Sequence, residues 1–212
     1  GSGFLALPKE LDRFLEEIFE SCPMTVSIKT RIGVEDEEEW PQLLEIFEKY
    51  PLEELIIHPR LKTDQYKKNT IHWEAFKKAE ESSRHSLCYN GDIVCKEDYE
   101  KVVQRFPGTE KVMIGRGILK KPWLAEEIRN GDKKDSSRYK EELFGFHEEL
   151  LKGYMDYMSG DRNTLYKMKE LWAYLGTSFT NPERYMKKIR KSQHISEYRI
   201  WVGNLFREQD LI

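Results

Sequence analysis

The sequence predicts an α/β fold in which four parallel strands alternate with helices, followed by a small all-helical bundle. Two observations carry this prediction. Four short runs rich in β-branched and apolar residues, at 24–29, 54–58, 86–90 and 111–115, alternate with segments of helical period. Beyond residue 131 every apolar stripe has helical spacing. Because the strand-like runs begin roughly 25–32 residues apart, each connection can hold a helix, as in Rossmann-type sheets and in β/α barrels.

The chain opens on a helix and not on a strand. Pro8 begins a segment in which Leu11, Leu15 and Ile18 recur at helical spacing, and no strand-like run precedes it. Further helical segments lie at 40–47, 73–79, 99–106 and 123–128. A βα fold that starts on a helix lacks its first strand, so we expect an incomplete set of βα units.

The remainder of the chain predicts a separate helical region. A polar link at 132–137 precedes three apolar stripes and a short helix that starts at Asn181-Pro182, which indicates a bundle of about four helices. Residues 161–212 carry ten Lys and Arg against six Asp and Glu, whereas the rest of the chain carries 25 against 32. Either a site for a polyanion or a solvated helical surface accounts for this imbalance.

Length and composition exclude several classes of protein. The 212 residues fall short of a complete eight-stranded barrel, which takes about 250. No window approaches the roughly 18 consecutive apolar residues of a membrane span, so we expect no membrane association. Cys22, Cys88 and Cys95 match neither a disulfide framework nor a CxxC metal site, which predicts a cytoplasmic location and no bound metal.

Polar residues follow each predicted strand. In parallel sheets these ends gather at one edge, where chemistry takes place. A lysine and a histidine there could bind a carbonyl or an anionic ring, or could only cap the sheet. Glycines let a backbone approach a ligand, and a helix opening near residues 121–123 would favour a phosphate. The residues are Lys29, His58, Asn90, Gly91, Asp92, Gly115 and Arg116, with Arg31 and Arg60 in the loops beyond the first two strands.

Basic and aromatic residues alternate in the helical region. This pattern suits an RNA backbone with exposed bases, and a solvated helix face is the alternative. The basic residues are Lys167, Lys169, Arg184, Lys187, Lys188, Arg190 and Lys191.

Several motifs together resemble the flavin-dependent tRNA-dihydrouridine synthases. They are KTRIG at 29–33, HPR at 58–60 with Gln65, Tyr66 and Trp73 after it, YNGDI at 89–93 and MIGRGIL-KKPW at 113–123. The resemblance is close over residues 1–130 and looser beyond, through KMKELWAYL at 167–175 and RYMKKIRK at 184–191. It implies that residues 1–133 form the C-terminal half of an FMN-binding TIM-type β/α barrel, and that residues 134–212 form a helical tRNA-binding domain.

The resemblance also implies an activity and roles for residues. The activity is reduction of the uridine C5–C6 bond in tRNA, with FMN as cofactor and NADPH as reductant. Lys29 and His58 would contact the flavin ring. Arg31 and Arg60 would face the flipped uridine or its phosphates. The ribityl chain and phosphate would be held by Asn90, Gly91, Asp92, Gly115 and Arg116.

The sequence departs from the family in one respect. The family's general-acid cysteine precedes the first helix of this chain, and none of Cys22, Cys88 and Cys95 occupies its place. We therefore expect no catalytic residue within these residues, no uridine reduction by them alone, and self-association through an open half barrel. Two alternatives stay open: another FMN-barrel reductase that acts on a small molecule, and a non-catalytic RNA-binding scaffold.

Overall fold

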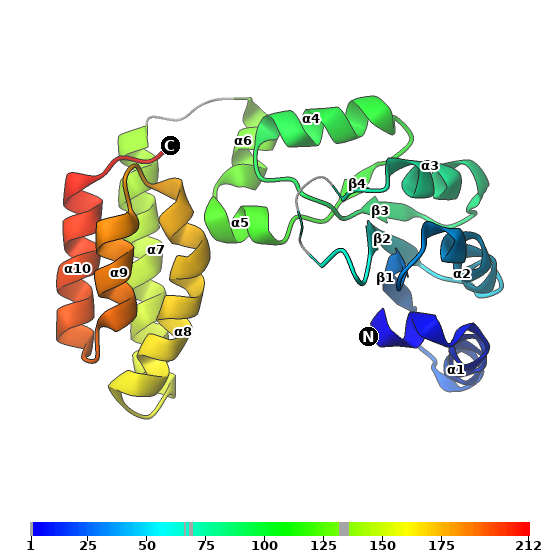
Figure 1. Ribbon diagram of the computed structural model, residues 1–212, viewed down its shortest axis with the longest axis horizontal. Helices are drawn as coiled ribbons and strands as arrows, with labels where there is room; N and C mark the ends of the chain where they lie inside the picture. The colour runs from blue at the N-terminus through cyan, green and yellow to red at the C-terminus, as the bar shows by residue number, and fades with distance from the viewer. Residues whose placement is uncertain (1, 66, 68–69, 132–135) are drawn as a thin grey trace. The chain divides into compact units, whose positions relative to one another are not determined.

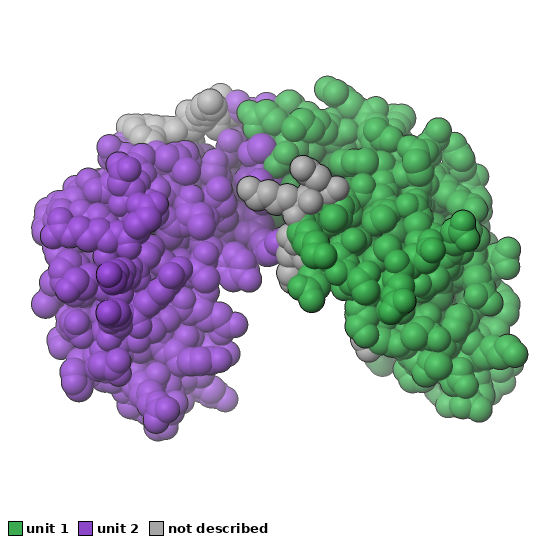
Figure 2. Space-filling view, in the orientation of Figure 1, with its two compact units in different colours: residues 1–92, 97–114 green, residues 93–96, 115–212 purple. Residues whose placement is uncertain are grey.

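A computed structural model describes residues 2–65, 67, 70–131 and 136–212 of the chain. The chain divides into two compact units, which Figure 2 shows in different colours. Unit 1 comprises Gly1–Asp92 and Glu97–Ile114, and unit 2 comprises Ile93–Lys96 and Gly115–Ile212. The predicted domain boundary at 133/134 and most of the predicted polar link lie outside the described residues.

Unit 1 is built on a four-stranded parallel sheet with the strand order β1-β2-β3-β4 (Figure 1). The α/β class predicted from the sequence, with four parallel strands followed by a helical part, is confirmed. The strands are β1 (Ser27–Gly33), β2 (Glu54–Leu61), β3 (Leu87–Tyr89) and β4 (Lys111–Val112).

The first two strands extend further than the sequence indicates. Arg31 and Arg60, expected in loops, lie within β1 and β2. Pro59 does not interrupt β2, because its position faces the β3 side, and β3 has already ended at Tyr89, the partner of Ile57. The Pro59 carbonyl accepts a bond from the backbone N–H of His72 at 2.8 Å instead. Charged residues and a proline therefore continue a strand that composition alone would end.

One face of the sheet carries the apolar core of unit 1. The predicted helices are present as α1 (Pro8–Ser21), α2 (Trp40–Phe47), α3 (Trp73–Ser82) and α4 (Lys96–Arg105). Ile32, Leu55 and Ile57 of the sheet are fully buried, as are Trp40 and Phe76 of the helices. Each such side chain contributes about 2–3 kcal/mol by leaving water. The indole N–H of Trp40 donates to the Ala75 carbonyl at 2.8 Å and ties α2 to α3.

Unit 2 is helical, as predicted. Two short helices, α5 (Arg116–Lys120) and α6 (Leu124–Asn130), precede the four longer ones. These are α7 (Ser136–Tyr157), α8 (Gly160–Leu175), α9 (Glu183–Lys191) and α10 (Ile195–Glu208). None of the helices in the described ranges has the length and apolarity needed to cross a bilayer.

The core of the bundle contains a polar network. The Trp172 indole donates to the Tyr198 hydroxyl at 2.6 Å, and that hydroxyl lies 2.6 Å from Nε2 of His147. All three side chains are buried. Burial and the charge of Arg199 lower the pKa of His147 to about 4, so the imidazole is neutral at pH 7. Its Nε2 then accepts a hydrogen bond from the Tyr198 hydroxyl.

Candidate functional site

The face of the sheet opposite the apolar core, which we call the open face, carries a cluster of cationic side chains. Side chains alternate between the two faces of a strand, so Lys29 and Arg31 share the face opposite the core, and register pairs Arg31 with His58 on the neighbouring strand. Arg60, two residues after His58, points to the same face. Lys29 and His58, expected at the ends of adjacent strands, lie within β1 and β2 with their side chains on one face, and their contact with a cofactor stays a prediction.

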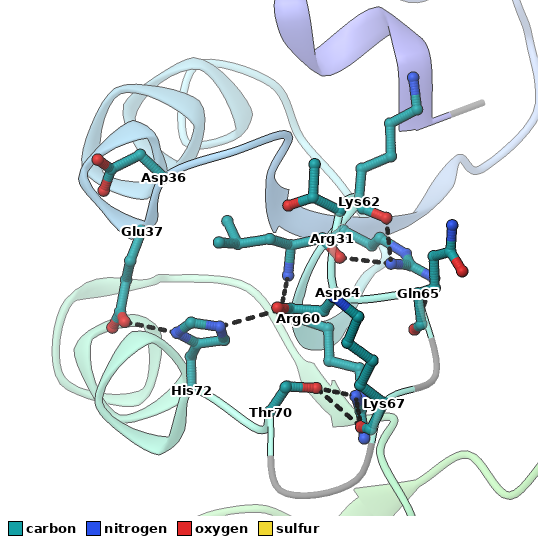
Figure 3. Close-up of polar contacts among 12 residues, drawn as sticks. Arg31, Asp36, Glu37, Arg60, Lys62, Asp64, Gln65, Lys67, Thr70 and His72 are labelled. Atoms are coloured by element: carbon teal, nitrogen blue, oxygen red, sulfur yellow. Dashed lines mark hydrogen bonds and ion pairs between the residues drawn. The ribbon is translucent and has the colours of Figure 1, made fainter.

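Arg31 is engaged by the turn that follows β2. Its Nη1 donates to the Leu61 carbonyl at 2.5 Å, and Nη2 lies 3.5 Å from the carbonyl oxygen of Gln65. Figure 3 shows this guanidinium directed into the turn. Gln65 has a φ of 51°, in the left-handed region that favours glycine, which costs about 1–2 kcal/mol. Arg31 therefore helps to hold a strained turn at the edge of the open face.

Arg60 is the most deeply buried charged residue of the cluster. Its side chain is 0% exposed, and it donates to the Lys67 carbonyl at 2.5 Å, to the Thr70 hydroxyl and to the Asp92 carboxylate. Nε of Arg60 is buried without a hydrogen-bond partner among the described residues. Arg60 thus connects β2, the segment after it and the turn after β3, and it offers one further N–H to an acceptor.

A second set of contacts, which no sequence pattern predicts, is centred on His72. Its Nδ1 lies 2.6 Å from the Glu37 carboxylate, and its Nε2 lies 3.0 Å from Asp64 (Figure 3). Asp64 also accepts the backbone N–H of Leu61 at 2.7 Å, at the end of β2. His72 and Glu37 are 35 residues apart, so no local pattern could have found this pair. The contacts fix the turn that receives Arg31.

Burial and the surrounding charges keep the imidazole of His58 neutral. Burial and the nearby charges of Arg31, Lys29 and Arg60 lower the pKa of His58 to about 4. Desolvation and the charge of Arg31 also lower the pKa of Lys29. At neutral pH the face therefore combines cationic donors with a histidine that can donate one N–H and accept at its other nitrogen. Such a face suits a ligand rich in acceptor oxygens and able to carry negative charge.

The turn after β3 borders the same cluster. Nδ2 of Asn90 donates to the Met113 carbonyl at 2.8 Å. A Cβ on Gly91 would lie 2.5 Å from the Tyr89 hydroxyl oxygen, so the packing of Tyr89 already requires glycine there. Asp92 reaches Arg60. Asp92 thus connects this turn to Arg60, whereas the contact of Asn90, Gly91 and Asp92 with a cofactor stays a prediction.

Gly115 and Arg116 belong to unit 2, where α5 starts at Arg116. The helix expected to open near residues 121–123 is α6, which begins at Leu124, and α5 is a separate short helix before it. Between the two helices Lys121 is extended with a φ of −127°, because Pro122 disfavours a helical residue before it. The five residues of α5 are too few to attract a phosphate by their dipole. A Cβ on Gly115 would meet no described atom within 4 Å, so packing does not require this glycine.

The basic residues of α9 divide between two sides of the helix. Lys187, Arg190 and Lys191 line a groove against the C-terminal part of α8. Arg184 and Lys188 lie over aromatic rings instead. The Lys188 Nζ is 5.1 Å from the centroid of the Trp201 ring, and the Arg184 guanidinium is 5.9 Å from that of Tyr185. The sequence did not distinguish these two sets.

The two lysines of α8 have partners within unit 2. Lys169 Nζ donates to the Ser192 carbonyl at 2.5 Å, which satisfies a carbonyl at the end of α9. Lys167 pairs with Glu170 at 3.4 Å. Lys169 therefore has a structural contact, and its predicted contact with RNA is not tested by it.

The cysteines form no site in the described residues. None of Cys22, Cys88 and Cys95 takes part in a disulfide within the described residues. Burial and the charge of Glu54 raise the pKa of the Cys88 thiol to about 11, which keeps it protonated on the open face of the sheet. The described ranges hold no group of three or more His, Cys, Asp or Glu arranged to bind a metal.

Comparison with known proteins identifies the family. The profile described as Dihydrouridine synthase (Dus) matches residues 1–205. The chain belongs to the dihydrouridine synthase family. It is 25% identical over 211 residues to the tRNA-dihydrouridine(16) synthase of Vibrio parahaemolyticus, a match that covers 94% of this chain and 63% of that protein.

Two further relatives extend the comparison. A probable tRNA-dihydrouridine synthase of Helicobacter pylori is 27% identical over 176 residues, which cover 82% of this chain and 52% of the relative. A probable tRNA-dihydrouridine synthase 2 of Bacillus subtilis is 29% identical over 155 residues, 71% of this chain and 46% of the relative. The chain thus spans less than two thirds of the length of these curated relatives.

Proposed function

We propose that the protein carrying this chain reduces a uridine of tRNA to 5,6-dihydrouridine, with FMN as its cofactor and NADPH as its reductant. The observation that carries the proposal is the cluster on the open face of the sheet, where Lys29, Arg31 and Arg60 surround a neutral His58 in a member of this family. The relatives named above as tRNA-dihydrouridine synthases support tRNA as the substrate.

The donor set fits a flavin mononucleotide. Its isoalloxazine ring presents carbonyl oxygens and ring nitrogens, and the open face supplies N–H donors from Lys29 and His58. The buried Nε of Arg60, which has no partner among the described residues, can donate to a further acceptor oxygen. When bound, FMN supplies the hydride that reduces the uridine C5–C6 bond.

The residues of the chain have separate tasks in this proposal. Lys29 donates to the ring and stabilises negative charge there, which its ammonium can do while it stays protonated. The neutral His58 donates one N–H. Arg60 and Arg31 hold the turns at 61–65 and 90–92, and Asn90, Gly91 and Asp92 bind the ribityl chain. The basic side chains of α9 bind the tRNA backbone.

Lysine substitutions on the sheet provide the test. The protein that carries this chain is incubated with an unmodified tRNA transcript, FMN and NADPH. Dihydrouridine is then quantified by mass spectrometry of the nucleosides. Lys29→Met should lower the rate about 10²–10³-fold, the cost of losing one donor to developing charge. Lys111→Met is the matched control, because Lys111 lies on the same register row of the sheet but pairs with Glu54 at 2.9 Å.

The outcomes separate the candidate functions. Dihydrouridine formation that depends on Lys29 and not on Lys111 supports the proposal. Salt-dependent tRNA binding without FMN affinity indicates the RNA-binding scaffold instead. Flavin reduction by NADPH without any tRNA binding indicates a reductase of small molecules. Either of the last two results overturns the proposal.

A further inference from the structure

A groove of about 390 Å³ runs between the end of α8 and α9. Its apolar lining includes Ala173, Gly176 and Met186, which we call the floor. A Cβ on Gly176 would collide with the sulfur of Met186, so this glycine sets how closely the two helices approach. The volume lies in the range of pockets that take small ligands.

The rim of the groove is cationic. Lys187, Arg190 and Lys191 line it, at positions i, i+3 and i+4 of one helix, so their side chains lie along one face. Glu183 is the one acidic residue that lines the groove among the described residues. In the described parts of the chain no ion pair engages any of these three cations.

This combination differs from the other side of the same helix. Arg184 and Lys188 lie over aromatic rings that are part of the bundle, and neither of them lines the groove. The backbone of a nucleic-acid duplex needs only cations on a convex surface. An apolar hollow directly beside three cations fits a ligand with both an anionic group and a planar apolar group.

We propose that this groove holds one unstacked nucleotide of a single-stranded RNA segment. The phosphate lies against Lys187, Arg190 and Lys191, and the base covers the floor formed by Ala173, Gly176 and Met186. The inference rests on the proposed function and refines it, since it assigns RNA binding to one side of α9 and to a base as well as a phosphate.

Two pairs of substitutions on α9 test which side of the helix binds RNA. Lys187→Gln with Arg190→Gln removes two cations from the groove, and Arg184→Gln with Lys188→Gln removes two from the opposite side. Binding of a fluorescent oligouridylate of about ten nucleotides is measured by anisotropy at several salt concentrations. The first pair should weaken binding about tenfold and lower the log–log salt slope by about 1.4, and the second should change affinity less than about threefold.

A third variant tests the base. Ala173→Leu fills the floor with a good helix former and leaves every charge in place. It should weaken binding of oligouridylate about tenfold and leave binding of an abasic phosphodiester of equal length unchanged. Thermal unfolding curves that match the parent confirm that each variant folds.

Each remaining outcome overturns the inference. Equal losses from the two double variants would show diffuse charge attraction. Equal effects of Ala173→Leu on the abasic and base-containing oligomers would exclude a base in the groove. Displacement of oligouridylate by polyglutamate at equal charge would indicate an acidic protein partner. If intact tRNA still binds in these cases, only the groove assignment fails. If the unsubstituted protein does not bind tRNA at all, the proposed function is overturned as well.

Discussion

Replacing Arg60 by methionine tests the central structural element of the candidate site. Methionine has a similar length and no charge, so it keeps most of the packing and removes the contacts to Asp92, Thr70 and the Lys67 carbonyl. The expected result is a loss of stability confined to unit 1, together with release of the turn that follows β3.

The structure sets the size of this loss. Removing one partner of a buried ion pair costs about 3–5 kcal/mol, because the other charge is left without compensation. The Arg60 side chain is 0% exposed but that of Asp92 is 37% exposed, so water can solvate part of the remaining carboxylate. We therefore expect about 3 kcal/mol, at the lower end of that range. With an m-value of about 2 kcal/mol/M, the urea midpoint of unit 1 should fall by about 1.5 M.

The assay combines urea unfolding with hydrogen exchange of the β2 amides, which reports unit 1 separately from unit 2. Arg105→Met is the control. Arg105 pairs with Glu74 at 2.8 Å and lies 5.4 Å from the Trp73 ring centroid, but the two charged side chains are 47% and 69% exposed, so its loss should cost under about 1 kcal/mol. If Arg60→Met costs no more than Arg105→Met, the Arg60 contacts do not hold the site together.

Three further predictions concern single positions. Gly91→Ala should destabilise the protein by about 1–3 kcal/mol, because its Cβ would meet Tyr89. Gly153→Ala, whose Cβ would meet no described atom within 4 Å, should stabilise it by about 0.5–1 kcal/mol. Unfolding temperatures that both rise or both fall would contradict this pair of predictions. The pKa of His147 is lowered from 6.5 to about 4, so the stability it contributes is complete above pH 6.5 and declines by about 3 kcal/mol as the pH falls through 4; an NMR titration of its imidazole with a midpoint near 6.5 would refute the assignment. Lys169→Met should cost about 1 kcal/mol and speed amide exchange in α9, because it frees the Ser192 carbonyl, and unchanged exchange would show that this bond contributes nothing.

The periodicity of the sequence predicts the architecture because local spacing determines which residues can be buried together. The helices that begin at Pro8 and Trp40, and the short helix after Pro182, are present where their apolar spacing places them. The predicted ends of β1 and β2 are wrong: the sequence pattern predicts Lys29 and His58 as the last residues, whereas the strands continue to Gly33 and Leu61. Polar residues on the open face resemble a loop in composition, although their backbone stays paired.

The site itself was only partly predictable, because its contacts join segments that are distant in sequence. The motifs bring Lys29, His58 and Arg60 to attention, but not the contact between Arg60 and Asp92, which are 32 residues apart. His72 contacts Asp64 and also Glu37, which lies 35 residues before it. Only the tertiary fold brings these groups within hydrogen-bonding distance.

The geometry also separates the roles of the three cations on the open face. Arg31 and Arg60 donate hydrogen bonds to backbone carbonyls, and Arg60 also donates to Asp92, so they organise the turns at 61–65 and 90–92. Lys29 has no hydrogen bond or ion pair with any described residue, although desolvation and the charge of Arg31 lower its pKa. A positive charge held beside other cations is stabilised when an electron-rich ligand arrives, so the ligand should raise the pKa of Lys29. Comparing the pKa of Lys29 with and without FMN would therefore show which cation faces the cofactor, and an unchanged pKa would exclude Lys29 from that role.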